Sequence, residues 1–217
     1  MPTLVEQFGQ IDIYLFDQLL RGRIQPGMRI LDAGCGAGRN LVYLLRTAQA
    51  ERYEIFGADS DQGAIAAVRR LSGFLAPTLP GTNFHVEAIE AMSFPDGFAN
   101  VVISSAVLHF ASSDLHFQAM LQGTWRVLKP GGLMFCRLAS SIGIEDQIWR
   151  IAGRRCRLPD GSERYLVDAA FLTELTHQLG AQLADPIKTT VVQNQRSMTT
   201  WVITKNEFRN KEATLPV

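Results

Sequence analysis

Three glycines in one short segment are the residues whose spacing says most about chemistry. Gly34, Gly36 and Gly38 stand at every second position, directly after the apolar run Met28–Ala33 and before leucines at helical spacing. Glycines at such a turn let the chain bend sharply and let a ligand approach the main chain without a Cβ in its way. The segment therefore predicts a binding loop between a strand and a helix.

The spacing of these glycines argues against two common nucleotide sites. A dinucleotide fingerprint places its third glycine three residues after the second, and that position is Arg39 here. The phosphate-loop pattern GxxxxGKS/T is absent from the sequence. Asp32 adds a carboxylate at the end of the preceding strand, which disfavours a pyrophosphate and favours a cationic ligand group. A dinucleotide-dependent oxidoreductase is therefore disfavoured.

A second carboxylate, Asp59, follows the next strand candidate, Tyr53–Ala58. In an open parallel sheet this strand end lies beside the first glycine loop, at the crevice where the strand order reverses. A carboxylate there can accept hydrogen bonds from both hydroxyls of a ribose. Asp61 is the competing candidate, but its position also suits the N-cap of the following helix.

Strand-like and helix-like stretches alternate along the chain, which predicts a parallel sheet covered by helices on both faces. The last two strands are separated by a short polar turn and should pair as an antiparallel hairpin. We therefore expect an α/β fold with a doubly wound, mostly parallel seven-stranded sheet and an antiparallel C-terminal hairpin strand. Besides the two strands above, strands are expected at 83–87, 100–104, 133–138, 182–192 and 197–204.

A chain of 217 residues suits one domain with a single core. Residues 1–26 are expected to form an N-terminal helical cap, in which the amphipathic stretch Ile11–Leu20 packs in the core or forms a lid. Residues 139–167 interrupt the alternation with an arginine-rich segment. We expect an insertion that is partly helical over Glu145–Arg155 and covers the acceptor side. Residues 206–217 are expected to form a loosely held tail.

The composition limits the kinds of partner that the protein is expected to bind. The 21 lysines and arginines balance the 21 aspartates and glutamates, so no strong field draws the protein to nucleic acid or to an anionic membrane. No apolar run approaches the ~18 residues that span a bilayer, and Met1–Gln10 lacks the pattern of a secretory signal. The 3 cysteines are widely spaced and without a CxxC, so neither a disulfide framework nor a metal site is expected. We expect a cytoplasmic protein and leave its oligomeric state open.

Five motifs in order resemble those of class I S-adenosylmethionine (SAM)-dependent methyltransferases, enzymes with a Rossmann-like fold. The resemblance covers residues 25–138 well and implies a transferase that uses SAM and releases S-adenosylhomocysteine (SAH). The five motifs are the glycine loop Leu31–Gly38, the strand end Gly57–Asp59, and the segments Glu87–Asp96, Val101–Phe110 and Arg126–Gly132.

The resemblance implies a role for each matching position. Asp32 and the glycine loop would hold the methionine part of SAM, Asp59 the ribose, and Ser60 would lie against the adenine. Ala88 and Ile89 would flank the base, with the Ile89 amide near a ring nitrogen. Many relatives carry at position 88 an aspartate that binds the adenine amino group, so this chain departs from the pattern there. The expected cofactor-binding residues are Asp32, Gly34, Cys35, Gly36, Gly38, Asn40, Asp59, Ser60, Ala88, Ile89 and Ser105.

Acceptor contacts are expected at the carboxyl ends of the fourth and fifth strands, where Ser104, His109 and Arg137 lie. His109 could act as a general base, because an imidazole titrates near neutral pH. The alternative is that His109 packs in its loop and only shapes the pocket. The leading hypothesis is methyl transfer to a small molecule, since no nucleic-acid-binding module accompanies the domain. The alternatives are methylation of RNA or protein docked on residues 139–167, or a cofactor-binding protein without transfer activity.

Overall fold

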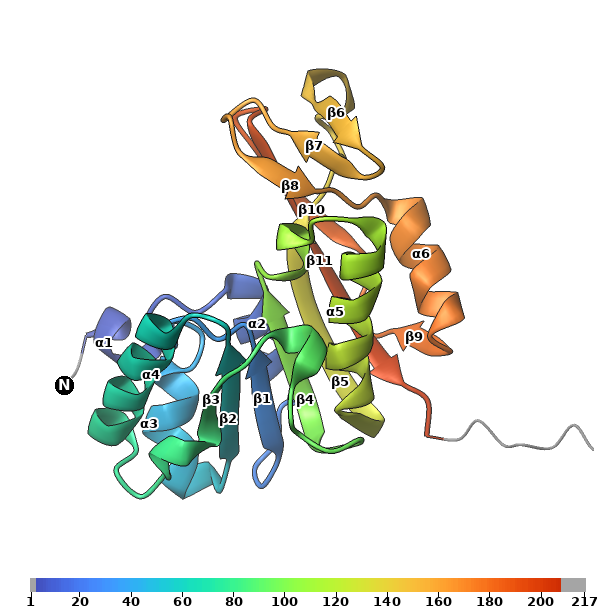
Figure 1. Ribbon diagram of the computed structural model, residues 1–217. Helices are drawn as coiled ribbons and strands as arrows, with labels where there is room; N and C mark the ends of the chain where they lie inside the picture. Colours follow the sequence, from blue (N-terminus) through green and yellow to red (C-terminus); the bar gives the residue numbers. More distant parts are fainter. Residues whose placement is uncertain (1–2, 208–217) are drawn as a thin grey trace, which may run out of the picture.

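Parallel strands form the centre of the structure, a computed structural model that describes residues 3–207 (Figure 1). The main sheet runs in the order β10-β11-β5-β4-β1-β2-β3, and β9 also pairs with β11. Strands β1 to β5 are mutually parallel, whereas β11 is antiparallel to β5, β9 and β10. The predicted fold class is therefore confirmed. The strands are β1 Arg29–Ala33, β2 Glu54–Asp59, β3 Phe84–Val86, β4 Ala99–Ser105, β5 Leu128–Ala139, β9 Ala181–Leu183, β10 Lys188–Val192 and β11 Arg196–Lys205.

Helices connect these strands and cover the sheet. Two of them begin at side-chain caps: Asp61, the position suggested by the sequence, accepts hydrogen bonds from the first amides of α4, and Asp168 accepts one from α6. The helices are α1 Leu4–Phe8, α2 Ile13–Leu20, α3 Val42–Glu51, α4 Gln62–Leu75, α5 Asp114–Arg126 and α6 Ala169–Gln178. Short 3-10 turns are η1 Gly81–Asn83, η2 Ile89–Ala91, η3 Leu108–Phe110 and η4 Glu145–Gln147.

Each face of the sheet has its own apolar core, because successive residues of a strand point to opposite faces. Ile30 and Val101 belong to a buried cluster that also contains residues of α2, α3 and α4. Their neighbours Leu31 and Val102 belong to a second cluster with residues of α5 and α6. Figure 1 shows α3 and α4 on one side of the sheet and α5 and α6 on the other. Burial on both faces explains why these strands read as continuous apolar runs.

Two expectations about the C-terminal half are wrong. The predicted strand 182–192 is two strands, β9 and β10, because Asp185 and Pro186 interrupt the pairing with β11. The insertion is not helical over Glu145–Arg155, where only the short η4 turn forms. It folds instead into a small antiparallel sheet of β6 Trp149–Ala152, β7 Arg155–Arg157 and β8 Glu163–Tyr165.

Local chemistry explains why the insertion forms strands. Gly153 adopts a φ of 54° between β6 and β7, a conformation that suits a tight turn and not a helix. Across the next pair of strands, Glu163 accepts hydrogen bonds from Arg155 at 2.7 Å and from Arg157 at 2.9 Å. The two arginines thus flank the opposing carboxylate from one face of β7.

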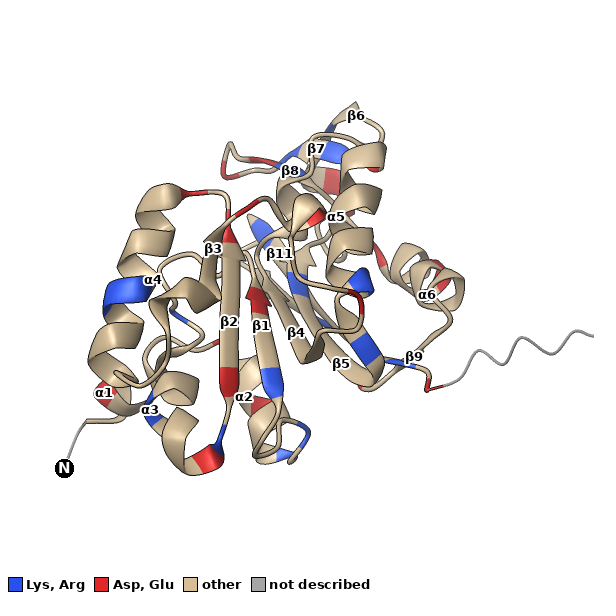
Figure 2. Ribbon diagram, turned by 60° about the horizontal axis from the view of Figure 1, so that its bottom comes forward, with Lys and Arg blue, Asp and Glu red and all other residues tan. Residues whose placement is uncertain are grey.

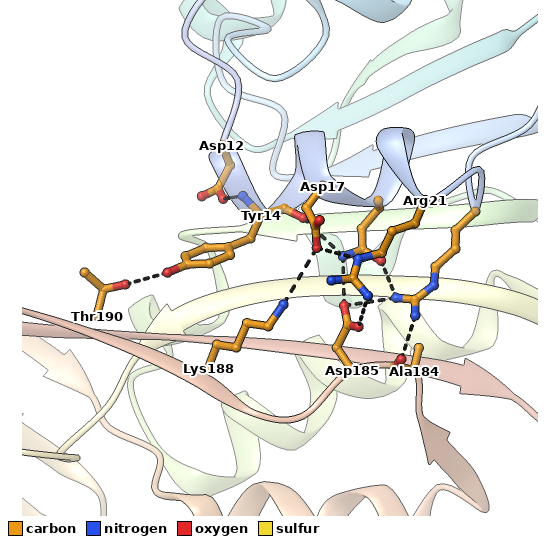
Figure 3. Close-up of polar contacts among 10 residues, drawn as sticks. Asp12, Tyr14, Asp17, Arg21, Ala184, Asp185, Lys188 and Thr190 are labelled. Atoms are coloured by element: carbon orange, nitrogen blue, oxygen red, sulfur yellow. Dashed lines mark hydrogen bonds and ion pairs between the residues drawn. The ribbon is translucent and has the colours of Figure 1, made fainter.

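Polar contacts hold α2 against the C-terminal strands (Figure 3). The carboxylate of Asp185 lies 2.9 Å from the Arg23 guanidinium and accepts a hydrogen bond from Gln18 at 2.9 Å. The Tyr14 hydroxyl lies 3.1 Å from Thr190 Oγ1. These contacts favour core packing over a lid for the N-terminal helix. The tail predicted at 206–217 falls almost wholly outside the described residues.

Candidate cofactor site

The glycine loop has the conformation that its composition predicts. Gly34, Gly36 and Gly38 have φ angles of 86°, 52° and 86°, in the region that favours glycine. A Cβ on Gly34 would lie 2.3 Å from Val107, and one on Gly38 would lie 2.8 Å from Val68. A Cβ on Gly36 would meet no atom within 4 Å. The loop is therefore packed against the protein at both ends and open to a ligand in the middle.

A cavity of about 770 Å³ lies over this loop, at the carboxyl ends of the central strands. Nine of the eleven residues predicted to bind the cofactor line it, whereas Asp32 and Gly38 are buried and do not line it. The structure therefore brings together residues from segments that are distant in sequence. The nine are Gly34, Cys35, Gly36, Asn40, Asp59, Ser60, Ala88, Ile89 and Ser105.

Asp59 is held in place by two backbone amides. Its Oδ2 accepts a hydrogen bond from the Gly36 N–H at 2.8 Å, and its Oδ1 accepts one from the Asp61 N–H at 2.9 Å. A carboxylate oxygen can accept more than one hydrogen bond, so each oxygen retains capacity toward the cavity. The fixed carboxylate suits a pair of neighbouring hydroxyl groups, as on a ribose.

Asp32 is a buried carboxylate without a hydrogen-bond partner among the described residues. Acidic bands near the ends of β1 and β2 lie close together in Figure 2. Burial raises the pKa of Asp32 to about 7, and Asp59 adds to this shift while the Arg39 charge opposes it. A cationic group bound in the cavity would favour the ionised form. The charge of this buried carboxylate would therefore favour a positive charge in the cavity, such as that of the methionine part of SAM.

Cys35 lies in the cavity wall and is 4% exposed. Burial raises the pKa of its thiol, so it is a neutral packing group rather than a nucleophile. Within residues 3–207 all three cysteines are free and buried. In the same part of the chain no cluster of three His, Cys, Asp or Glu side chains suits a metal ion.

His109 is buried outside the cavity wall, although sequence analysis placed it near the acceptor. Its Nδ1 accepts a hydrogen bond from the Ala139 N–H at 3.1 Å. Burial, with a smaller effect of the Arg164 charge, lowers the pKa of His109 to about 4. These contacts favour the packing interpretation over the general base.

Several residues of the wall were not assigned to the site from the sequence. Arg39 directly follows the last glycine of the loop, and its Nη2 donates a hydrogen bond to Ser105 Oγ at 3.3 Å. Glu90 and His116 lie side by side in the wall, with His116 Nε2 3.4 Å from Glu90 Oε1. The position of Arg39 beside the loop was a usable signal. No local signal pairs Glu90 with His116, because the pair depends on how α5 packs on η2.

Comparisons with known sequences match the same part of the chain. Residues 30–132 match the family described as a methyltransferase domain. An uncharacterized methyltransferase of Synechocystis sp. is 28% identical over 110 residues, which are 51% of this chain and 46% of that protein. Phthiotriol/phenolphthiotriol dimycocerosates methyltransferase 1 of Mycobacterium ulcerans is 31% identical over 60% of this chain and 45% of its own. The matched segment thus spans less than half of each of these relatives.

Solved structures share the fold over most of the chain. A SAM-dependent methyltransferase of Methanosarcina mazei superposes with a TM-score of 0.65 at 18% identity, covering 87% of this chain and 97% of its own. The 1,6-didemethyltoxoflavin-N1-methyltransferase of Burkholderia thailandensis, solved with SAH, gives a TM-score of 0.68 at 14% identity, covering 92% and 79%. These structures confirm the predicted fold. The match of residues 30–132 to the methyltransferase-domain family agrees with the resemblance seen in the sequence.

Proposed function

We propose that this chain is a class I SAM-dependent methyltransferase domain that transfers the methyl group of SAM to a small molecule. The observation that carries the proposal is the cavity that joins the open centre of the glycine loop to the fixed carboxylate of Asp59. Such a cavity suits a ligand with a charged amino-acid part at one end and a ribose in the middle.

Each part of SAM would have a partner in the wall. Asp59 would accept hydrogen bonds from the ribose hydroxyls, and the guanidinium of Arg39 would bind the carboxylate of the methionine part. Ser60 and the Ile89 amide would contact the base. SAM, when bound, supplies a methyl group already activated by its sulfonium, so the chain has to orient the acceptor and exclude water. No general base is required where the acceptor arrives deprotonated.

In this proposal the insertion would cover the acceptor side of the cavity. Phe110 lines the cavity and is 58% exposed, and the Arg164 guanidinium of β8 lies 4.8 Å from the centre of its ring. Arg164 forms no ion pair with an acidic residue in the described part of the chain, whereas Arg155 and Arg157 pair with Glu163. An exposed ring beside an uncompensated cation suits an acceptor with an apolar body and a negative or electron-rich group.

The relatives support a small-molecule acceptor. The Mycobacterium ulcerans relative is named for phthiotriol dimycocerosates, and a relative from Mycolicibacterium smegmatis, 30% identical over 58% of this chain and 43% of its own, is named a fatty-acid O-methyltransferase. The balance of 21 basic and 21 acidic residues gives no support for RNA. No helix within residues 3–207 is long and apolar enough to cross a membrane. A cytoplasmic location stays a prediction.

Calorimetric titration of the purified protein with SAM, SAH and NAD tests the cofactor. We expect micromolar binding of SAM and SAH and none of NAD, whereas NAD binding alone would refute the proposal. Formation of SAH in the presence of SAM and a mixture of metabolites, but not of total RNA, tests the acceptor class. SAH formation with RNA alone would favour the docking role of the insertion.

A further inference from the structure

One end of the cavity lies between η2 and the first turns of α5, where its wall carries Glu90 and His116. The two elements approach closely because Gly123 of α5 has no side chain. A Cβ there would lie 2.2 Å from the carbonyl oxygen of Ile89. The close approach places His116 Nε2 3.4 Å from Glu90 Oε1, and each side chain is 33% exposed. A polar pair therefore faces the cavity at this end.

The neighbouring turn determines which tautomer the His116 ring adopts. Its Nδ1 accepts a hydrogen bond from the Ser112 backbone N–H at 3.1 Å. The proton of the neutral imidazole therefore lies on Nε2, the nitrogen that faces Glu90. The Nε2–H of His116 thus lies beside the Glu90 carboxylate, which has no other polar side-chain partner in the part of the chain that the structure describes. The carboxylate retains acceptor capacity toward a ligand.

The strand order determines which part of a ligand reaches this end. Gly34 and Ser105 lie over β1 and β4, Asp59 ends β2, and Ala88 follows the edge strand β3. A nucleoside whose ribose is bound by Asp59 extends its base past β2, toward η2. We propose that Glu90, oriented by His116, accepts a hydrogen bond from the exocyclic amino group of adenine. The inference rests on the proposed use of SAM.

Other groups near the base cannot make this contact. Ala88 offers only a methyl group. The carboxylate of Glu87 is already occupied: it accepts hydrogen bonds from the Ser93 N–H at 2.9 Å and the Ser93 hydroxyl at 2.7 Å, and lies 3.2 Å from His85 Nδ1. Glu90 is therefore the carboxylate with free acceptor capacity at this end of the cavity.

Calorimetric titration with two ligands tests the contact. SAH carries the amino group, and S-inosylhomocysteine carries a carbonyl oxygen in its place. We expect the wild-type protein to bind SAH at least tenfold more tightly, which corresponds to about 1.4 kcal/mol. In Glu90→Gln the side chain can donate to the carbonyl oxygen, so we expect the preference to fall about tenfold, toward equal affinity. His116→Phe should reduce the preference less than Glu90→Gln does.

Glu87→Gln is the matched control, because its carboxylate is used within the protein, and it should keep the wild-type preference. Circular dichroism checks that each variant is folded. An unchanged preference in folded Glu90→Gln would overturn the inference while leaving the proposed function intact. A folded wild-type protein that binds neither ligand would overturn the proposed function and this inference together.

Discussion

Replacing Asp59 with alanine is the sharpest test of the cofactor site. Both oxygens of this carboxylate are fixed by amides, Oδ2 by Gly36 at 2.8 Å and Oδ1 by Asp61 at 2.9 Å. The substitution removes the acceptor for two ribose hydroxyls and leaves two loop amides without their partner. Because the site is only partly buried, water replaces part of the loss. We expect binding to weaken by about 1–3 kcal/mol, or roughly 5- to 150-fold in Kd.

Calorimetric titration with SAH and with its 2′-deoxy analogue measures this loss and assigns it to the ribose. The wild-type protein should bind the deoxy analogue more weakly than SAH, whereas Asp59→Ala should distinguish the two ligands far less. Asp61→Ala is the matched control, because Asp61 accepts hydrogen bonds from Gly63 and Ala64 and caps α4. We expect it to lower stability by about 1 kcal/mol with little change in Kd. An Asp59→Ala protein that is folded and binds SAH with the wild-type Kd would refute the placement of the ribose.

Three further outcomes follow from the site. Gly36→Val should abolish SAH binding, because the valine side chain would project into the cavity and because valine rarely adopts the φ of 52° found here. A folded variant that binds SAH normally would refute the loop assignment. Burial raises the pKa of Asp32 to about 7, so the folded protein keeps this carboxyl protonated at pH values where the unfolded chain has released the proton. The free energy of unfolding therefore falls as pH rises from about 4 toward 7. Asp32→Asn should therefore stabilise the ligand-free protein at pH 8, and denaturant titration should show the gain shrinking toward pH 4. Arg164→Gln should raise the KM for the acceptor and leave the Kd for SAH unchanged, whereas an altered Kd would show that Arg164 acts on the cofactor.

The sequence alone predicted those parts of the candidate site that depend on residues close together in the chain. The glycine loop and Asp59 were recognisable because each lies at the end of a strand, and in a parallel sheet adjacent strand ends share one edge. The register confirms this geometry, with Asp32 opposite Gly57 and Asp59 two residues beyond. These features depend on a few residues and on short-range geometry.

Sequence did not predict features that depend on long-range packing. Residues 149–157 combine aromatic and β-branched residues with arginines, a composition that does not by itself distinguish a helix from strands. The turn at Gly153 and the hydrogen bonds to the opposing Glu163 favour strands. The break at Asp185 was marked by the following proline, but the contact of Asp185 with Arg23, far away in the chain, was not. Patterns of local hydrophobicity contain no information about such partners.

His109 and His116 show how burial decides between two similar candidates. Both lie in the segment after β4, and sequence analysis assigned only His109 to the acceptor side. The structure buries the ring of His109 outside the cavity wall, where its Nδ1 accepts the Ala139 amide, and it places His116 in the wall beside Glu90. The choice depends on Gly123, whose missing side chain lets α5 approach η2. A glycine inside a helix lowers stability by about 1 kcal/mol relative to alanine. Here the glycine allows α5 to pack against η2 more closely than a Cβ would permit, and this packing places a polar pair in the cavity wall.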